Sequence, residues 1–460
     1  MENGDCCWRS SLRCGTYLFP GRAATRTMPR QSILMAMPSP VSYLSELEWR
    51  GLLFQTTEGS REALDQGSLS GYCGFDPTAA SLHVGHLVQI MGLVHLQHAG
   101  HRPIALVGGG TGLIGDPKTT AERPLISKER AEENALAIRG QLERFLDFSG
   151  PHGARLRNNY EWLSTLGAID FMRDVGKHFT VNFMLGKEAV RARLDSGISY
   201  TEFSYMLLQA YDFLELYKRE GVTLQTGGSD QWGNIVAGRE LIRRTLGATV
   251  HGVTLPLVTM ASGRKFGKTE AGAVWLDRAL TSPYKFYQFW INAEDADAGR
   301  YLRFFTLKQQ DEIEALERAL AERPERREAQ EALASDVTSR VHGAAAAESA
   351  REVSRLLFDR NADPRQLSQE ALRVLREEIP FQEVTIGASP NEISVIDLLV
   401  CTRLAASKGE ARRQIQQGGV SVNGRRLGAA EFHVSREEAI LGGYVLVRKG
   451  ARDLALVQIS

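Results

Sequence analysis

The sequence lacks a long apolar run, a net charge and a cysteine pattern, and each absence excludes a class of protein. No apolar stretch approaches the ~18 residues that a membrane-spanning helix needs. The 55 Lys and Arg balance 55 Asp and Glu, so a polyanionic partner must bind to a local basic patch. Only five of the 460 residues are cysteines, and none forms a CxxC pair, which argues against a disulfide framework or a thiolate zinc site. The length predicts two or three globular domains.

The first 42 residues differ in composition from the rest of the chain. They contain five arginines against two acidic residues and show no amphipathic period. Met28, Met35 and Met37 offer later start codons. We expect residues 1–42 to be a disordered extension, or to precede the true start, in a cytoplasmic protein. The alternative is a transit peptide, which would place the protein in the mitochondrion.

The middle of the chain alternates strand and helix patterns. Three strands are predicted, at 69–75, 102–108 and 222–228. Ser81 is expected to cap a helix that closes near Gly100. Such alternation predicts an α/β domain with a Rossmann-like parallel sheet. Ligands of such sheets bind beyond the carboxyl ends of the strands.

Composition divides the remainder of the chain. From about residue 280 to 380 the pattern is helical and rich in charge, as expected for solvated helix faces. The segment 384–392 has the Gly, Ser and Pro content of a linker. In chain order, we expect an extension 1–42, a catalytic domain 43–260, a helical domain 261–383, a linker 384–392 and a small α+β domain 393–460.

The stretch GGGTGLIGDP (108–117) matches G-x-G-x-x-G after a strand, the pattern of a dinucleotide-binding loop. That site needs a helix directly after the third glycine, and an acidic residue that ends a second strand about 20 residues later. Here Pro124 discourages such a helix, and the region 20 residues on is helical in pattern. A Walker loop is excluded because Asp116 and Pro117 separate Gly115 from Lys118. We therefore expect the glycines of this stretch to serve a purpose other than a dinucleotide-binding loop or a Walker loop.

Two motifs flank this loop. His83 and His86 are three residues apart, so their rings share one face of a helix. A metal site would need a third ligand nearby, which the sequence does not offer, and surface histidines are the plain alternative. Lys265 and Lys268 lie in a loop punctuated by glycines, and an ordinary solvated loop is its plain alternative. Together, two imidazoles and two ammonium groups would suit a triphosphate whose charge grows in a transition state.

HVGH and KFGKT resemble the HIGH and KMSKS motifs of class I aminoacyl-tRNA synthetases. The longer strings YCGFDPTAASLHVGHL, GGGTGLIGDP, YTEFSYMLLQAYD and GGSDQWGN resemble the tyrosyl-tRNA synthetase family of the bacterial and mitochondrial type, over residues 43–460. The resemblance implies ATP-dependent activation of L-tyrosine and its transfer to the 3′ end of tRNA(Tyr). It also implies a homodimer.

The resemblance assigns residues to the substrate tyrosine. Tyr72 and Asp212 match the pair that binds the phenol hydroxyl. The match for the substrate ammonium comprises Asp116, Tyr205 and Gln209. Residues matching polar groups that orient tyrosine and nucleotide are Asp76 and Gln231. Tyr205, Gln209 and Asp212 occur at spacings of four and three, so one helix face presents all three, whereas Tyr211 is expected in the core.

The resemblance also assigns the ATP side. Thr78 and His83 match contacts to the γ-phosphate, and His86 matches a contact near the ribose. Expected catalytic residues in the second motif are Lys265, Lys268 and Thr269, and the glycines expected against ATP are Gly74 and Gly228. Phe266 and Gly267 depart from the Met and Ser of the consensus, Thr269 replaces the usual Ser, and Gly110 stands where Ala is frequent. No protein nucleophile is required, and Mg²⁺ would arrive with ATP rather than in a protein metal site.

The last segment predicts RNA binding. Its pattern is two helices with Ser407 as the second cap, an end at Gly418, and a hairpin turn at Asn423-Gly424. It resembles an S4 domain. Between 393 and 427 six basic residues face only two acidic ones, and the expected RNA-binding residues are Arg403, Lys408, Arg412, Arg413, Arg425 and Arg426.

Two other functions were weighed. A nucleotidylyltransferase with a HIGH-like motif would lack the Tyr72/Asp212 pair and an RNA-binding segment. A catalytically inactive relative retained for RNA binding would be expected to lose motif histidines or lysines, and all four are present.

Overall fold

The computed structural model describes residues 42–117, 125–263, 266–269, 272–359, 362–384, 392–429, 432–450 and 453–459. The expected extension, apart from Ser42, and residues 385–391 of the expected linker lie outside these ranges. Every helix within them is too short or too polar to cross a membrane.

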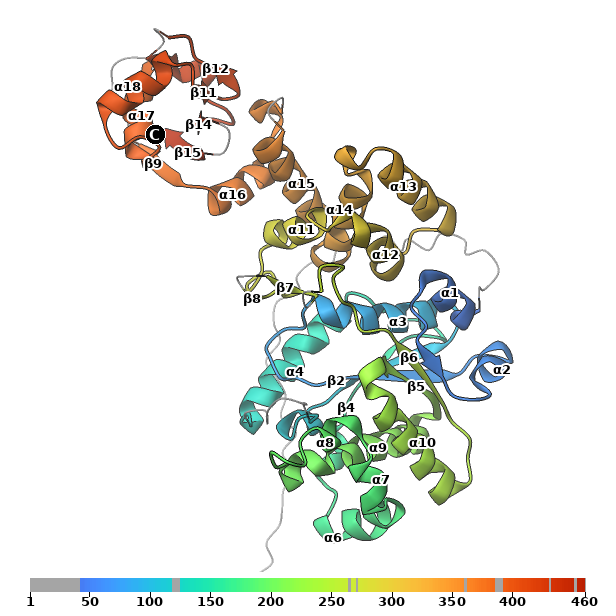
Figure 1. Ribbon diagram of the computed structural model, residues 1–460. Helices are drawn as coiled ribbons and strands as arrows, with labels where there is room; N and C mark the ends of the chain where they lie inside the picture. The colour runs from blue at the N-terminus through green and yellow to red at the C-terminus, as the bar shows by residue number, and fades with distance from the viewer. Residues whose placement is uncertain are drawn as a thin grey trace, which may run out of the picture. The chain divides into compact units, whose positions relative to one another are not determined.

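A six-stranded sheet forms the centre of the first half of the chain (Figure 1). Its strands are β1 (Gln55–Thr56), β2 (Ser70–Phe75), β3 (Arg102–Val107), β4 (Arg155–Asn158), β5 (Val222–Gly228) and β6 (His251–Leu255). The spatial order is β1-β6-β5-β2-β3-β4, and all neighbours are parallel except the β1–β6 pair. The predicted parallel sheet is thereby confirmed, and the three predicted strands correspond to β2, β3 and β5.

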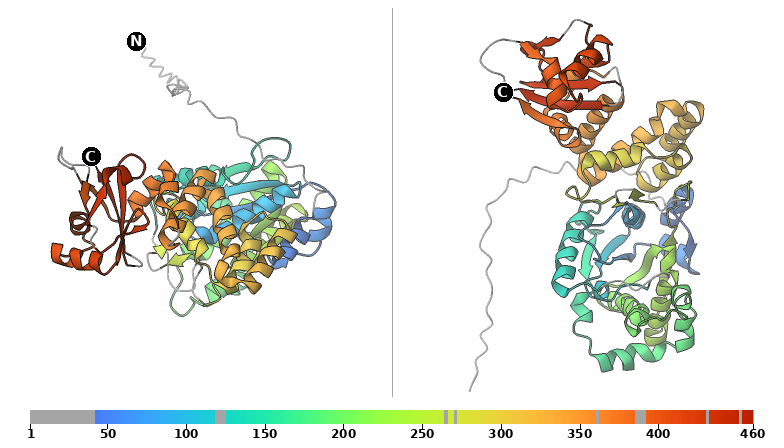
Figure 2. Two further views of the ribbon diagram at one scale, coloured as in Figure 1. Left: turned by 90° about the horizontal axis from the view of Figure 1, so that it is seen from above. Right: turned by 60° about the vertical axis from the view of Figure 1, so that its left-hand side comes forward.

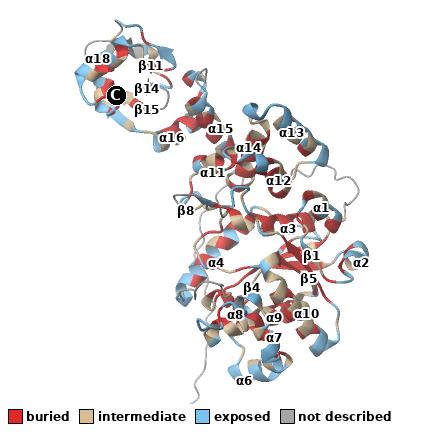
Figure 3. Cartoon of the chain, in the orientation of Figure 1, coloured by how far each residue is buried: buried red, intermediate tan, exposed pale blue. Residues whose placement is uncertain are grey.

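Each face of this sheet buries its own apolar cluster. In β2, Tyr72 belongs to one cluster and Cys73 to the other, as expected from the alternation of side chains along a strand. The helices that pack with Cys73 are α1 (Tyr43–Arg50), α3 (Leu87–His98) and α4 (Lys128–Leu142), and those that pack with Tyr72 are α9 (Tyr200–Glu220) and α10 (Trp232–Leu246). Figure 3 shows α3 largely buried, whereas α6 (Ala168–Asp170) is exposed. The other short helices are α2 (Ser60–Asp65), α5 (Tyr160–Leu163), α7 (Val181–Leu185) and α8 (Glu188–Arg191).

The predicted helical region follows the small hairpin of β7 (Lys268–Thr269) and β8 (Gly272–Ala273). Its helices are α11 (Pro283–Ile291), α12 (Asp295–Phe305), α13 (Gln310–Glu322), α14 (Glu328–His342), α15 (Ala344–Phe358) and α16 (Gln369–Glu378). Helices α11 to α15 gather in one bundle (Figure 2). Phe286, Trp290 and Phe305 are among its fully buried side chains.

The C-terminal region contains a second sheet of order β12-β11-β14-β15-β9. Its strands are β9 (Phe381–Val384), β11 (Val420–Val422), β12 (Arg425–Arg426), β14 (Tyr444–Lys449) and β15 (Asp453–Ile459). A separate pair is formed by β10 (Glu392–Ser394) and β13 (His433–Ser435), and the helices are α17 (Val395–Cys401) and α18 (Lys408–Gln416). Although β9 precedes the expected domain start at 393, it pairs in parallel with β15.

The local signals of this region are confirmed. Ser407 Oγ accepts a hydrogen bond from the backbone N–H of Glu410 at 3.2 Å, so it caps α18. Gly418 has a positive φ of 66° just after the helix. Asn423 and Gly424 both have positive φ, 48° and 81°, and connect β11 to β12.

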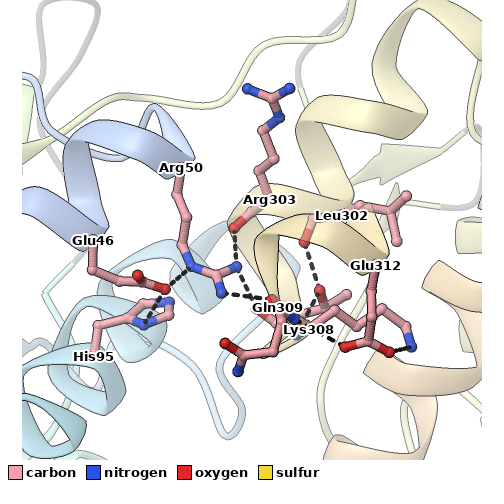
Figure 4. A network of polar contacts seen from close by, with 9 residues as sticks. Glu46, Arg50, His95, Leu302, Arg303, Lys308, Gln309 and Glu312 are labelled. Carbon is pink, nitrogen blue, oxygen red and sulfur yellow. Dashed lines mark hydrogen bonds and ion pairs between the residues drawn. The ribbon is translucent and has the colours of Figure 1, made fainter. Parts of the chain in front are cut away.

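Arg50, a buried arginine of α1, forms hydrogen bonds with the end of α12 and the residues after it (Figure 4). Arg50 is 3% exposed and donates to the carbonyl oxygens of Arg303, Thr306 and Lys308, each at 2.9 Å. Its Nε donates to Glu46 at 2.6 Å. Carbonyls near a helix C-terminus lack intrahelical partners, so the guanidinium satisfies groups that burial would otherwise leave unpaired.

We predict that Arg50→Ala lowers the free energy of unfolding by about 3 kcal/mol, because it leaves several buried acceptors without a donor. Urea unfolding at neutral pH measures the loss. The matched control is Arg61→Ala, which breaks an exposed ion pair with Glu48 and should cost less than about 1 kcal/mol. Equal losses in the two variants would contradict the prediction.

Candidate active site

The candidate site lies beyond the carboxyl ends of the central strands (Figure 1). The chain passes from β2 outward through β3 and β4, and then returns to the other side of β2 as β5. In open parallel sheets, ligands bind in the crevice at such a reversal of direction, here between the loops that follow β2 and β5. Most of the predicted substrate residues come from these strands, from the loops after them, or from α9.

Asp76 connects α9 to the glycine-rich loop after β3. Its Oδ2 accepts a hydrogen bond from the Tyr205 hydroxyl at 2.8 Å, and its Oδ1 accepts one from Thr111 Oγ1 at 2.7 Å. A Cβ at Gly108 would lie 2.1 Å from Asp76 Oδ1, so only glycine allows this approach. In the same way, a Cβ at Gly112 would lie 2.8 Å from the Pro77 ring. Glycines in this loop thus allow it to pack on the loop after β2.

Asp212 is a buried carboxylate held by two donors. It is 2% exposed, and it accepts hydrogen bonds from Trp162 Nε1 at 2.7 Å and from Asn159 Nδ2 at 2.9 Å. Burial raises the pKa of Asp212 to about 8, although both donors act in the opposite direction. The Tyr72 hydroxyl, also buried, has no hydrogen-bond partner among the described residues. Burial raises the pKa of this phenol, and the charge of Asp212 raises it further. Both groups are therefore poised to accept a polar partner.

Asp116 lies in a second polar cluster. It accepts from Gln231 Nε2 at 2.9 Å and from Asn234 Nδ2 at 3.4 Å. Lys187 donates to Asn234, and burial lowers the pKa of this lysine to about 8. Gln209 Nε2 donates to Gln231 Oε1 at 3.2 Å, whereas the buried Oε1 of Gln209 has no partner in the described part of the chain. This cluster therefore offers acceptors for a cationic group.

The two histidines lie together, but the predicted helix start is wrong. Ser81 donates to the carbonyl of Leu82 instead of capping a helix. His83 caps the short 3₁₀ turn Val84–His86 that precedes α3: its Nδ1 accepts from the backbone N–H of Gly85 at 3.0 Å. His86 Nδ1 accepts from the His83 backbone N–H at 3.1 Å, and the ring centroids are 4.0 Å apart. In the neutral rings, these bonds assign the proton to Nε2 of each histidine.

The second motif belongs to a segment that we call the signature segment, which comprises the described residues 261–263 and 266–269. Burial lowers the pKa of His83, and the positive charge of the exposed Lys268 lowers it further. Gly267 has φ 75°, and a Cβ there would lie 2.6 Å from Val84 Cγ2. The two motifs are thus in direct contact. Lys265 and the side chain of Thr269 lie outside what the structure describes.

The remaining predicted ATP residues lie around the crevice. The Thr78 backbone N–H donates to the Asp76 carbonyl at 2.9 Å, and its side chain is exposed. Gly74 is the penultimate residue of β2, with open space where a Cβ would be, and Gly228 ends β5 within reach of Gln89.

Tyr211 differs from its neighbours on α9. It is partly buried against the cluster that contains Tyr72 and Phe213, as expected for a packing residue. Burial raises its pKa to about 12.

The predicted RNA-binding residues lie on and around α18 and the β11–β12 hairpin. Lys408 pairs with Asp397 at 2.8 Å, and Arg425 with Glu438 at 3.1 Å. Arg412 lies over the Phe432 ring at 5.7 Å, and Arg426 donates to the Gly418 carbonyl at 2.6 Å. Arg403, at φ 60°, follows α17, and Arg413 lies on α18.

Sequence reasoning missed several polar residues of the site: Asn159, Trp162, Lys187, Gln225 and Asn234. The first two follow β4, whose sequence RLRN lacks the apolar alternation that reveals strands. Gln225 pairs in register with Tyr72, and its buried Oε1 has no partner among the described residues. Asn234 lies three residues after Gln231, a spacing that could have indicated a shared helix face. No pattern in the sequence indicated Lys187.

Comparison with protein families finds two matches. Residues 64–359 match the family described as tRNA synthetases class I (W and Y). Residues 373–457 match the Tyrosine--tRNA ligase SYY-like C-terminal domain, a range that includes β9.

Individual relatives cover nearly the whole chain. The chain is 53% identical to a tyrosine–tRNA ligase of Anaeromyxobacter dehalogenans over 417 residues, which are 90% of this chain and 99% of the relative. It is 49% identical to that of Geobacillus stearothermophilus over 422 residues, 91% of this chain and 99% of the relative. Among solved structures, a C-terminally truncated mitochondrial tyrosyl-tRNA synthetase of Aspergillus nidulans is similar, with a TM-score of 0.62 and 30% identity over 69% of this chain and 94% of that chain.

Proposed function

The chain belongs to the tyrosine–tRNA ligase family of class I tRNA synthetases, and from this premise we propose that it activates L-tyrosine with ATP and transfers the tyrosyl group to the 3′ end of tRNA(Tyr). The observation that carries the proposal is the buried pair of Tyr72 and Asp212 at the end of the crevice. Its polar atoms suit a phenol hydroxyl, which both donates and accepts.

The two polar clusters suit the two ends of tyrosine. Tyr72 and Asp212 would bind the phenol, and a ligand would give the Tyr72 hydroxyl the partner that it lacks. At the other end, Asp116 and the unpaired amide oxygen of Gln209 would accept from the substrate ammonium. Tyr205 bonds to Asp76 and would keep that carboxylate oriented toward the substrate.

Catalysis would consist of positioning and charge stabilisation. The tyrosine carboxylate attacks the α-phosphorus of ATP, and pyrophosphate leaves. His83 and His86 would donate from Nε2, and the positive charge of Lys268 would stabilise the negative charge that develops on the leaving pyrophosphate. Thr78, Lys265 and Thr269 are proposed to assist at the same phosphates, with Gly74 and Gly228 beside the nucleotide. Mg²⁺ would enter as part of the ATP substrate.

The function is tested by tyrosine-dependent exchange of pyrophosphate into ATP. We predict that Asp212→Ala lowers the preference for tyrosine over phenylalanine, in kcat/KM, by about 10- to 100-fold, because a buried phenol hydroxyl left without its partner costs about 1–3 kcal/mol. Tyr211→Phe is the matched control, since it removes a hydroxyl from the same helix outside the site. Absence of exchange in the wild-type protein would refute the function, and an unchanged preference would refute the role of Asp212.

We propose that the C-terminal region binds tRNA through its basic residues. Support comes from the excess of Lys and Arg around α18 and from the family match of residues 373–457. A deletion must remove β9 too, because β9 pairs in parallel with β15, whereas α16 packs against α15 and should be kept.

A chain that ends at Glu378, the last residue of α16, should therefore retain exchange but lose tRNA charging. The log–log salt dependence of tRNA binding should become shallower by roughly 0.7 to 0.9 per lost phosphate contact. Replacement of Arg412 and Arg413 by Gln in the full chain should shift the slope in the same direction by less. Unchanged charging KM and slope in the shortened chain would show that this region does not bind tRNA.

We also propose a homodimer formed through the segment around α6 to α9. Exposed apolar side chains gather there: Ile169, Met172, Val181, Phe183, Leu194 and Tyr200. Such exposure is costly in water unless a partner covers it. Tyr200→Asp should therefore convert the dimer to a monomer in sedimentation velocity, whereas Leu136→Asp, which changes an equally exposed leucine on α4, should not. A wild-type monomer at micromolar concentration would contradict the proposal.

The compartment that we propose is the cytoplasm. The mitochondrion is the alternative if residues 1–42 act as a transit peptide, and imaging of the full-length chain with a C-terminal tag distinguishes the two.

A further inference from the structure

Helix α12 contacts the signature segment at two separate places. At its start, Asp297 Oδ2 accepts a hydrogen bond from the backbone N–H of Ala261 at 2.8 Å. Further along, Phe266 stacks on Phe305, with ring centroids 5.4 Å apart and planes at 5°, and its ring lies 5.1 Å from that of Tyr301. The start of the signature segment and Phe266, two residues before Lys268, are therefore attached to one helix.

The spacing of these contacts is regular. Asp297, Tyr301 and Phe305 follow one another at intervals of four residues, so they lie along one face of α12. A helix is stiff over this length, and it therefore fixes the distance between Ala261 and Phe266. Asp297 provides the polar end of this attachment and the two aromatic rings provide the apolar end.

Asp297 is a carboxylate in a buried position, which requires compensation. It is 1% exposed, and Arg300 contacts its Oδ1 at 2.5 Å. The same Arg300 nitrogen donates to the Thr259 carbonyl, just before the signature segment. The first turn of α12 also favours a negative charge. An asparagine here would keep one acceptor but would turn amide hydrogens toward Arg300 or toward Ala261, so it could not serve both.

The opposite side of the signature segment contacts the histidine motif. The backbone N–H of Val274 donates to the Gly267 carbonyl, and that of Val84 donates to the Val274 carbonyl, both at 3.0 Å. A shift of the segment relative to α12 would therefore change the position of Lys268 relative to His83.

We propose that Asp297 is a positioning residue for the reaction: through Ala261 and Arg300 it holds the signature segment in register, so that Lys268 meets the phosphates of ATP. The inference rests on the proposed function. Tyrosine binds at the ends of β2 and β5 and at α9, on residues that make none of these contacts, so its affinity should be independent of Asp297.

The test is tyrosine-dependent ATP–pyrophosphate exchange in the full-length protein. Asp297→Asn should lower kcat by about 10- to 100-fold, as expected when a catalytic group is displaced by about an ångström, and leave equilibrium tyrosine binding unchanged. The matched control is Asp295→Asn, which removes a carboxylate from the same helical turn. Asp295 bonds Gln330 at 2.6 Å and does not contact the signature segment in the described residues, so its variant should keep wild-type kcat.

Two further variants separate positioning from stability. Arg300→Ala should show the same loss of kcat. Because the Arg300 side chain is partly exposed, this variant provides the test if Asp297→Asn fails to fold. Asp297→Asn combined with Lys268→Ala should lose little more than Lys268→Ala alone, because both act through the same lysine. The proposal would be overturned if the losses of kcat from Asp297→Asn and Lys268→Ala were additive, or if Asp297→Asn and Arg300→Ala both left kcat unchanged. It would also be overturned if Asp297→Asn weakened tyrosine binding as much as it lowered kcat. If Lys268→Ala alone leaves exchange unaffected, the proposed role of the signature segment fails instead.

Discussion

The buried carboxylate of Asp212 is the constraint on which the rest of the site depends. A carboxylate in this position is unfavourable unless donors surround it, and Asn159 and Trp162 supply them from the chain just after β4. That requirement explains why a short, polar edge strand ends beside α9. Asn159 Nδ2 also donates to Thr111, which donates to Asp76, so a single chain of hydrogen bonds connects the two carboxylates.

This chain of hydrogen bonds gives the glycine-rich loop its role. Thr111 is the member that the loop contributes, and it reaches Asp76 because Gly108 allows the backbones to approach. Farther along the loop, Asp116 is held by Gln231, just before α10, and by Asn234 on α10. The loop has the glycine pattern of a phosphate-binding loop, but here it positions a carboxylate. The hydrogen-bond partners around the loop, rather than its glycine pattern, distinguish the two roles.

The phosphate side of the crevice is supported by a different part of the chain. The histidine motif meets the signature segment through backbone hydrogen bonds and a close glycine contact, and the segment rests on α12. Arg50 attaches the far end of α12 to α1 (Figure 4). The amino-acid side is held mainly by β2, α9 and α10, so the two halves of the substrate site have separate supports.

By itself, the sequence determined the class of fold, the strands β2, β3 and β5, the caps of the C-terminal helices and the residues of four motifs. These depend on local patterns, such as apolar alternation, turn residues and motif spacing, which are readable along the chain. Only the tertiary structure decided that Asn159, Trp162, Lys187 and Asn234 join the site, that His83 rather than Ser81 caps a turn, and that β9 belongs to the C-terminal sheet. Their roles arise from partners distant in sequence, and a polar residue is identified by the group that it bonds, which no local pattern encodes.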